Sequence, residues 1–351
     1  MTISHDDLRA AVARGILTEA QTAQLIGFAE ARRAAKATVT PVEEPFVLFK
    51  GFNEIFVVVG LSILFSGWVG VAFLMGVDVN APAGNITVAL SALTIVGLAA
   101  VGHYFTLTRR MIAPSIALSV MTALTAVVLG FALIGVGGAS GVALVALVVM
   151  AIMAGHYAMF RVPFSAAIIA GAAFFALWSG LTALGLFGDE TAGFLTISGN
   201  GPLSVMTVVF GLAVFGLAMR LDLSDPHRIS TRSATAFWLH VVAAPAIVNT
   251  VAINLLDNRG AAAQGGLVAF LLLIALVAIV IDRRSFLVSG AGYSVALAVT
   301  VFSGGAAFAI LTLGLILVLL GAQWDRLRAT IMHRLPDFPG KSNLPPYGVT
   351  A

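Results

Sequence analysis

Long apolar runs separated by short polar turns fill the chain from residue 53 to residue 321. The runs are continuous rather than alternating, and each is about as long as an α-helix must be to cross a bilayer, roughly 17–25 residues. Turn residues divide them into ten predicted spans. They are 53–75, 86–107, 113–136, 140–160, 163–186, 203–219, 236–255, 265–281, 286–303 and 306–321.

The last two predicted spans have a second interpretation. Only the short stretch SGGAAF, residues 303–308, separates them. Residues 286–321 therefore form either two full spans or one broken, re-entrant element.

Composition indicates the class of protein. Hydrophobic residues make up 60% of the 351 positions and charged residues only 10%, whereas a soluble domain is about 25% charged. Such a chain has too few polar side chains to cover its surface in water. Lipid leaves no water for unpaired backbone groups, so helices are required where the apolar runs do not alternate. The sequence predicts an all-α, polytopic membrane helix bundle.

The distribution of basic residues predicts an orientation. With ten spans, every Lys and Arg except Arg259 lies on one side of the membrane. Positive residues concentrate on the cytoplasmic side, so both termini are expected in the cytoplasm. The predicted layout is an N-terminal helical hairpin and linker at 1–50, a transmembrane bundle at 51–322 and a C-terminal tail at 323–351.

Capping patterns organise the N-terminal segment. Ser4 with Asp7 and Thr18 with Gln21 both match capping signals, and Gly15 stands where a first helix would end. Two short helices are expected, at about 5–14 and 19–36. They form either an amphipathic cap near the bilayer surface or a module that docks a cytoplasmic protein.

Several stretches carry a resemblance to a known family. LRAAVARGILTEAQTAQLIGFAEAR precedes FKGFNEIF, and FWLHVVAAP, DRRSFLVSGAGY and LPDFPGKSNLPP follow in order. Together they resemble a family of bacterial multipass inner-membrane proteins of unknown function with a short N-terminal helical hairpin. The resemblance implies a bacterial inner membrane, and it brings no activity and no catalytic residue.

Signatures of the common enzyme classes are missing from the sequence. The chain has no cysteine, and it lacks HExxH, G-x-S-x-G and GxxxxGK[ST] motifs. No Asp or Glu lies in the middle of a predicted span, which disfavours a proton pump with buried carboxylates. The net charge of +3 is spread over short loops. We therefore expect no enzyme, no cofactor and no nucleic-acid partner.

Three histidines lie a few residues inside the predicted cytoplasmic boundary: His103, His156 and His240. Imidazoles at one depth could bind a metal or haem iron. The favoured interpretation of His103 and His156, each followed by tyrosine, is an interfacial anchor. No metal site is predicted.

The seventh predicted span is the richest in polar markers. It contains His240, Pro245, Asn249 and Asn254. Polar side chains on a span usually point into the bundle and bond neighbouring helices. Helix packing is the favoured interpretation, and a substrate path through these four residues is the alternative.

On the first span, Ser62, Ser66 and Gly70 form a small-residue stripe that predicts close approach of another helix.

Two functions remain compatible with the sequence. The first is a permease for a small neutral or apolar molecule. The alternative is a non-catalytic membrane scaffold or sensor whose N-terminal hairpin docks a cytoplasmic protein. The lipid bilayer is the predicted partner in both cases, and the sequence does not indicate an oligomeric state.

Overall fold

The computed structural model describes most of the chain beyond residue 50 and a few residues before it. The described residues are 11–12, 14–18, 20–22, 51–77, 85–135, 137–187, 201–228, 230–258, 260–301 and 306–347. Within these ranges the protein is all-α, with no strand. The chain divides into two compact units, Met1–Glu43 and Glu44–Ala351.

In the first unit, the second capping box is confirmed. The Thr18 amide donates to Gln21 Oε1 at 3.0 Å, and the Gln21 amide donates to Thr18 Oγ1 at 3.2 Å. This exchange satisfies amides that the first turn of a helix leaves without partners. Gly15 has a left-handed backbone, with φ of 71°, and its amide donates to the Val12 carbonyl. The predicted cap at Ser4 and Asp7 lies outside the described residues.

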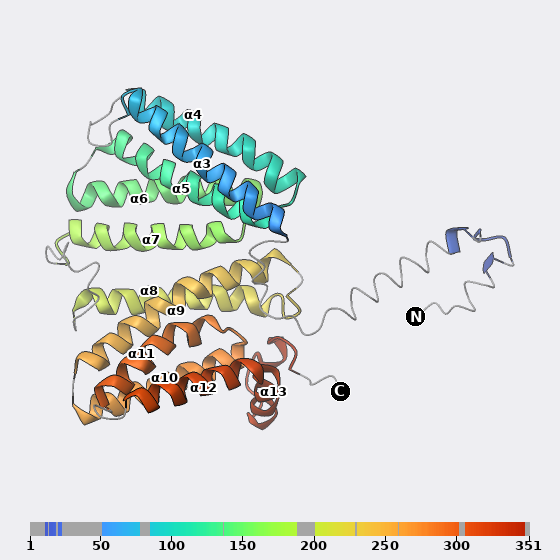
Figure 1. Ribbon diagram of the computed structural model, residues 1–351, viewed down its shortest axis with the longest axis vertical. Helices are drawn as coiled ribbons and strands as arrows, with labels where there is room; N and C mark the ends of the chain where they lie inside the picture. The colour runs from blue at the N-terminus through green and yellow to red at the C-terminus, as the bar shows by residue number, and fades with distance from the viewer. Residues whose placement is uncertain are drawn as a thin grey trace. The chain divides into compact units, whose positions relative to one another are not determined.

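The second unit is a bundle of long apolar helices joined by short turns (Figure 1). In chain order these are α3 (Phe52–Leu74), α4 (Asn85–Gly102) continued by the π-helix η1 (His103–Thr108), α5 (Ile112–Ile134), α6 (Gly138–Phe160), α7 (Phe164–Ala183), α8 (Pro202–Leu223), α9 (Thr231–Asp257), α10 (Ala261–Ile281), α11 (Ser285–Val301) and α12 (Ala306–Ala322). A shorter polar helix, α13 (Trp324–Arg334), and a 3-10 turn, η3 (Lys341–Asn343), follow.

Eight helices of the described chain are long and apolar enough to cross a membrane. They are α3, α4 with η1, and α5 to α10, at the positions of the first eight predicted spans. The protein is therefore a membrane protein with several apolar helices of spanning length. Helices α11 and α12 have 17 residues each, about 25 Å at the α-helical rise, which is short of a typical hydrocarbon core.

The sharp bend near the C-terminus lies after α12. Helices α11 and α12 are separate and contact each other, while residues 302–305 between them are outside the described ranges. The axis turns by 80° between Ile310–Ala322 and Trp324–Arg334. This bend lies beyond residues 286–321, so the choice between two full spans and one re-entrant element there stays open.

Alternating helix directions bring the basic turns together at one end of the bundle, the end at which α13 lies (Figure 1). We call this the basic end. It carries Arg109, Arg110, Arg161, Arg228 and the turn Asp282–Arg284. Arg259, expected at the other end, lies outside the described residues.

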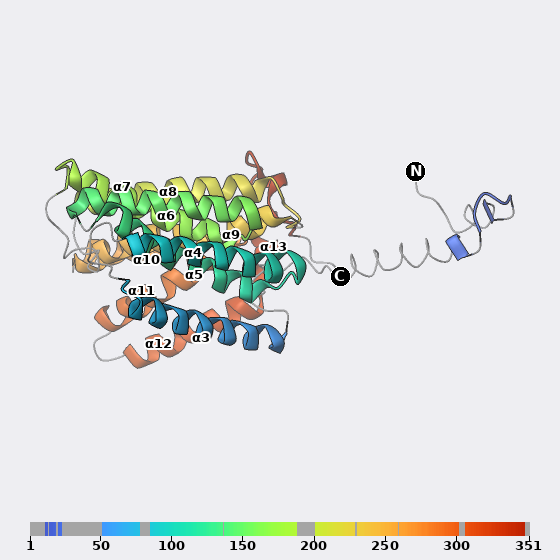
Figure 2. The same ribbon diagram turned by 90° about the horizontal axis from the view of Figure 1, so that it is seen from above.

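Packing differs strongly along the bundle. Helix α8 packs closely on α9, where Gly211 allows the approach: a Cβ there would lie 2.8 Å from Ile247 Cγ1. Helix α3, in contrast, contacts mainly α5 and buries only Glu54. Seen from above, α3 and α12 lie on the opposite side of the unit from α7 and α8 (Figure 2).

The predicted small-residue contact on α3 is wrong. Ser62, Ser66 and Gly70 are all exposed, and no atom from another helix lies within 4 Å of a Cβ built on Gly70. The Ser66 hydroxyl instead donates to the Ser62 carbonyl of its own helix at 2.8 Å. Spacing alone identified a face that allows close approach, but no helix of the described part of the chain occupies it.

Candidate functional site

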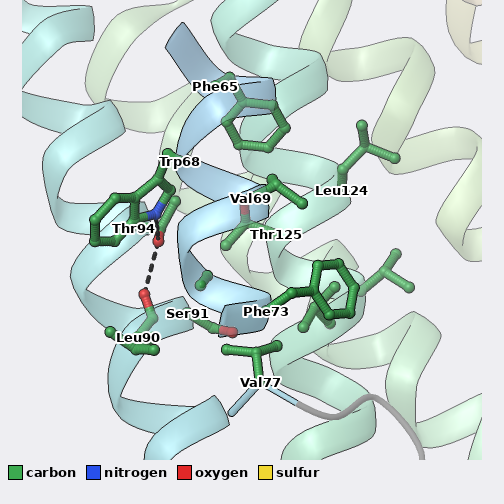
Figure 3. A pocket seen from close by; sticks show the side chains of 13 residues that line it. Phe65, Trp68, Val69, Phe73, Val77, Leu90, Ser91, Thr94, Leu124 and Thr125 are labelled. Carbon is green, nitrogen blue, oxygen red and sulfur yellow. Dashed lines mark hydrogen bonds between the residues drawn. The ribbon is translucent and has the colours of Figure 1, made fainter. Parts of the chain in front are cut away.

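A cavity of about 350 Å³ lies between α3, α4 and α5 (Figure 3). Aromatic side chains from α3, among them Phe65, Trp68 and Phe73, form one wall, and α4 and α5 form the others. None of its 13 lining residues is charged. Phe73 and Leu124 remain 55% exposed, so the cavity opens at the outer surface of the bundle.

Three polar groups of this wall, those of Trp68, Thr94 and Thr125, are bound within the protein. Trp68 Nε1 donates to Thr94 Oγ1 at 2.7 Å, and the Thr94 hydroxyl donates to the Leu90 carbonyl at 2.7 Å (Figure 3). The Thr125 hydroxyl donates to Met121 O. Because these hydrogen bonds are already made, the cavity presents mostly hydrocarbon and aromatic surface. It suits a neutral ligand with an apolar body.

A second feature is a buried charged centre at the basic end, formed by Asp222 of α8, His240 of α9 and Arg283 of the turn before α11. Their exposed fractions are 4%, 0% and 0%. Arg283 Nε donates to Asp222 Oδ2 at 2.9 Å, and Arg283 Nη2 donates to Asp222 Oδ1, a bidentate pair. His240 Nε2 lies 3.0 Å from Asp222 Oδ2. Since a carboxylate only accepts, this nitrogen is the donor.

Aromatic rings enclose the charged centre. The His240 ring makes edge contacts with Phe215 at 5.5 Å and Phe286 at 5.9 Å. The Arg283 guanidinium carbon lies 5.9 Å from the centre of the Phe237 ring. His240 Nδ1 and Arg283 Nη1 are buried and have no hydrogen-bond partner within the described part of the chain. The centre joins α8, α9 and α11, and low polarity around it strengthens the attraction between its charges.

A second ion pair ties the same turn to the C-terminal segment. Arg228 Nη1 lies 3.0 Å from Asp282 Oδ2, and Trp324 Nε1 of α13 donates to Asp282 Oδ1 at 2.6 Å. Arg328 of α13 donates to the carbonyls of Ile279, Pro345 and Pro346. The turn Asp282–Arg283 therefore holds α8 and α9 on one side and α13 on the other.

The residues of the predicted substrate path lie along α9. Pro245 is inside the helix and half-buried, as are Asn249 and Asn254. The Asn254 side chain donates to the Thr250 carbonyl of its own helix at 2.7 Å. Neither these three residues nor His240 lines any of the three cavities described for this protein.

The other two histidines have separate surroundings. His103 is exposed at the start of η1. His156 is half-buried on α6, where its Nδ1 lies 3.1 Å from Ser165 Oγ and its ring centre lies 4.9 Å from that of Phe160, with the rings tilted by 55°. Among the described residues, no three His, Cys, Asp or Glu side chains are grouped to hold a metal ion. The structure brings His240, but not His103 or His156, into the charged centre.

Sequence reasoning did not identify Asp222 and Arg283 as partners of His240. The sixth span was expected to end at residue 219, which left Asp222 outside it, but α8 continues to Leu223 and buries this carboxylate. One feature of the sequence could have indicated this contact. Asp222, His240 and Arg283 all lie near the same predicted end of their spans, at a similar depth. Glu54 is a further buried acid at this end, and it accepts hydrogen bonds from the Ile112 and Ala113 amides at the start of α5.

Comparisons with protein-family models, curated proteins and solved structures find no match to this chain. The resemblance to bacterial inner-membrane proteins therefore stays a prediction.

Proposed function

We propose that the protein is a bacterial inner-membrane permease for a small neutral or apolar molecule, and that the cavity between α3, α4 and α5 is its binding site. In this proposal α11 and α12 complete ten spans, and both termini lie in the cytoplasm. The basic end would then face the cytoplasm, in keeping with the positive-inside rule.

The observation that carries the proposal is the uncharged, aromatic cavity beside a loosely packed helix. Its volume of about 350 Å³ is in the range that small-molecule sites occupy. The absence of a charged side chain from its lining favours a neutral ligand. Because α3 buries only Glu54, it can shift without breaking a large apolar core.

The charged centre supports the proposal because it would keep three helices in place while others move. Asp222, His240 and Arg283 hold α8, α9 and α11 together by buried hydrogen bonds. A permease needs one part that moves against another that does not. We assign the moving part to α3 and α4 and the fixed part to α8, α9 and α11.

Quenching of Trp68 fluorescence tests the binding site. The full chain is reconstituted in lipid vesicles, with the other three tryptophans replaced by phenylalanine, and titrated with bromohexanol, a neutral quencher with an apolar body. The proposal predicts saturable quenching. Ala72→Phe, which fills the cavity, should raise the half-saturating concentration about tenfold or more, since it removes the volume that the ligand needs.

Ala92→Phe provides the matched control. Ala92 is on α4, one residue from Ser91 of the lining, but it is exposed and outside the cavity. It should leave the titration unchanged. Quenching that rises linearly without saturation in every variant would mean that bromohexanol reaches Trp68 only from the bilayer, and the binding site would be refuted.

The second candidate is a scaffold or sensor that docks a cytoplasmic protein. It is favoured by the division of the chain, because Met1–Glu43 form a compact unit separate from the bundle. Deleting residues 1–43 should abolish recovery of a partner and leave the unfolding temperature of the bundle unchanged. An identical set of co-purified proteins with and without these residues would sink this candidate.

A further inference from the structure

Four residues other than glycine have a left-handed backbone in the described part of the chain. They are Arg110, Arg161, Arg228 and Asp282, with φ between 51° and 58°. Each lies in a turn at the basic end, after η1, α6, α8 and α10 respectively. Glycine usually occupies such positions because a Cβ is disfavoured there. A charged side chain at all four turns indicates that the side chain itself is needed.

For two of the four, the partner is visible. Buried Arg228 and half-buried Asp282 form an ion pair with each other at 3.0 Å. Arg110 and Arg161, in contrast, are exposed and make no ion pair with any described residue. Their side chains therefore lack an acidic partner within this part of the protein.

Both of these arginines line one cavity of about 370 Å³ at the basic end. The turn before α5 and the turn between α6 and α7 form one side, and the first part of α9 forms the other. The Thr106 and Ser115 hydroxyls share a hydrogen bond of 2.8 Å in its wall. Phe164 and Trp238 lie edge to face at 4.7 Å and add aromatic surface.

The composition of this cavity defines the ligand that it fits. Two guanidinium groups favour a phosphate or carboxylate, while the aromatic and aliphatic wall favours a hydrocarbon. Glu54 lies behind the lining residue Ile112, but its carboxylate accepts the amides at the start of α5. The cavity itself is lined by two positive charges and no acid.

We propose that the cavity between Arg110, Arg161 and Trp238 binds the phosphate of an anionic phospholipid, with the acyl chains lying against its aromatic wall. Basic pockets between helices at the cytoplasmic ends of spans bind such headgroups. The site is distinct from the cavity at α3 and does not depend on the permease proposal.

Native mass spectrometry of the full chain in neutral detergent tests the proposal. Phosphatidylglycerol and phosphatidylcholine are added at equal concentration, and the dissociation constant of each is measured. Phosphatidylglycerol should bind more tightly. The double variant R110Q/R161Q should weaken its binding roughly thirtyfold and leave phosphatidylcholine binding unchanged. R326Q/R334Q removes two exposed arginines of α13 at the same end, and should change neither.

The proposal is overturned by equal affinity for both lipids, by an equal loss in R326Q/R334Q, or by displacement of the lipid by inorganic phosphate at matched concentration. The last would show that the site takes free phosphate rather than a lipid. If R110Q/R161Q does not fold, the same lipid affinities are measured for R110K/R161K instead. It should still prefer the anionic lipid but bind it more weakly, because lysine cannot make bidentate contacts. Unchanged affinity in the lysine variant would also overturn it.

Discussion

The two halves of the bundle handle their polar groups in opposite ways. Around α8, α9 and α11, charges are buried and paired: Asp222 accepts from both His240 and Arg283. Around α3, α4 and α5, an uncharged wall surrounds an open cavity, and its hydrogen bonds join neutral groups such as Trp68 and Thr94. One half therefore spends its polar groups on buried contacts between helices, and the other leaves an uncharged cavity of about 350 Å³.

Loss of the central carboxylate should have the largest effect. Asp222→Asn would leave the buried Arg283 charge without its partner, and breaking a buried pair costs about 3–5 kcal/mol. Chemical unfolding in detergent micelles measures the loss. Asp257→Asn, at the exposed end of α9, should have no measurable effect. Equal stability of the two variants would show that the charged centre does not hold this half together.

Substitution of the glycine at the close contact between α8 and α9 should cause the next largest loss of stability. Gly211→Ala places a Cβ 2.8 Å from Ile247 Cγ1 and 3.3 Å from the Ile247 amide nitrogen, so overpacking should cost about 1–3 kcal/mol. Gly216→Ala on the same helix and Gly70→Ala on α3 meet nothing within 4 Å, and both should be neutral. The unfolding free energies of the three variants test the contrast. A loss at Gly70 as large as that at Gly211 would contradict loose packing of α3.

A polar change in the cavity wall should have the smallest effect. Thr94→Val removes the acceptor of the Trp68 hydrogen bond and should cost about 0.5–1.5 kcal/mol. Thr312→Val, where the exposed hydroxyl bonds only its own helix, is the control and should cost less. Unfolding and Trp68 emission are measured together. If Thr94→Val lowered the unfolding free energy as much as Asp222→Asn does, the two halves would not differ in the way described.

The positions of the helices could be predicted because they depend on local pattern. Apolar runs longer than about 17 residues mark α3 to α10 within a few residues, and the capping box at Thr18 and Gln21 is confirmed by its two hydrogen bonds. Both features are set by neighbours in sequence. The prediction that a helix packs on the small-residue stripe at Ser62–Gly70 was wrong, because the stripe describes one surface and does not specify which helix packs against it.

The charged centre could not be predicted in the same way. Asp222 and Arg283 are 61 positions apart, and their contact depends on α8 continuing beyond its apolar run and on how α9 and α11 pack. The cavity at α3 depends on a helix that packs on α5 rather than on the whole bundle. Apolar periodicity carries neither kind of information, since it does not specify partners between helices.

Locating a bound ligand tests the central claim most directly. Crystals of the full chain grown with bromohexanol allow the bromine to be placed by anomalous scattering. The account predicts a bromine peak in the cavity between Trp68 and Thr125, and none beside α9. A peak beside Pro245 and Asn249, with the cavity at α3 empty, would contradict the account and would place the ligand along the polar helix instead.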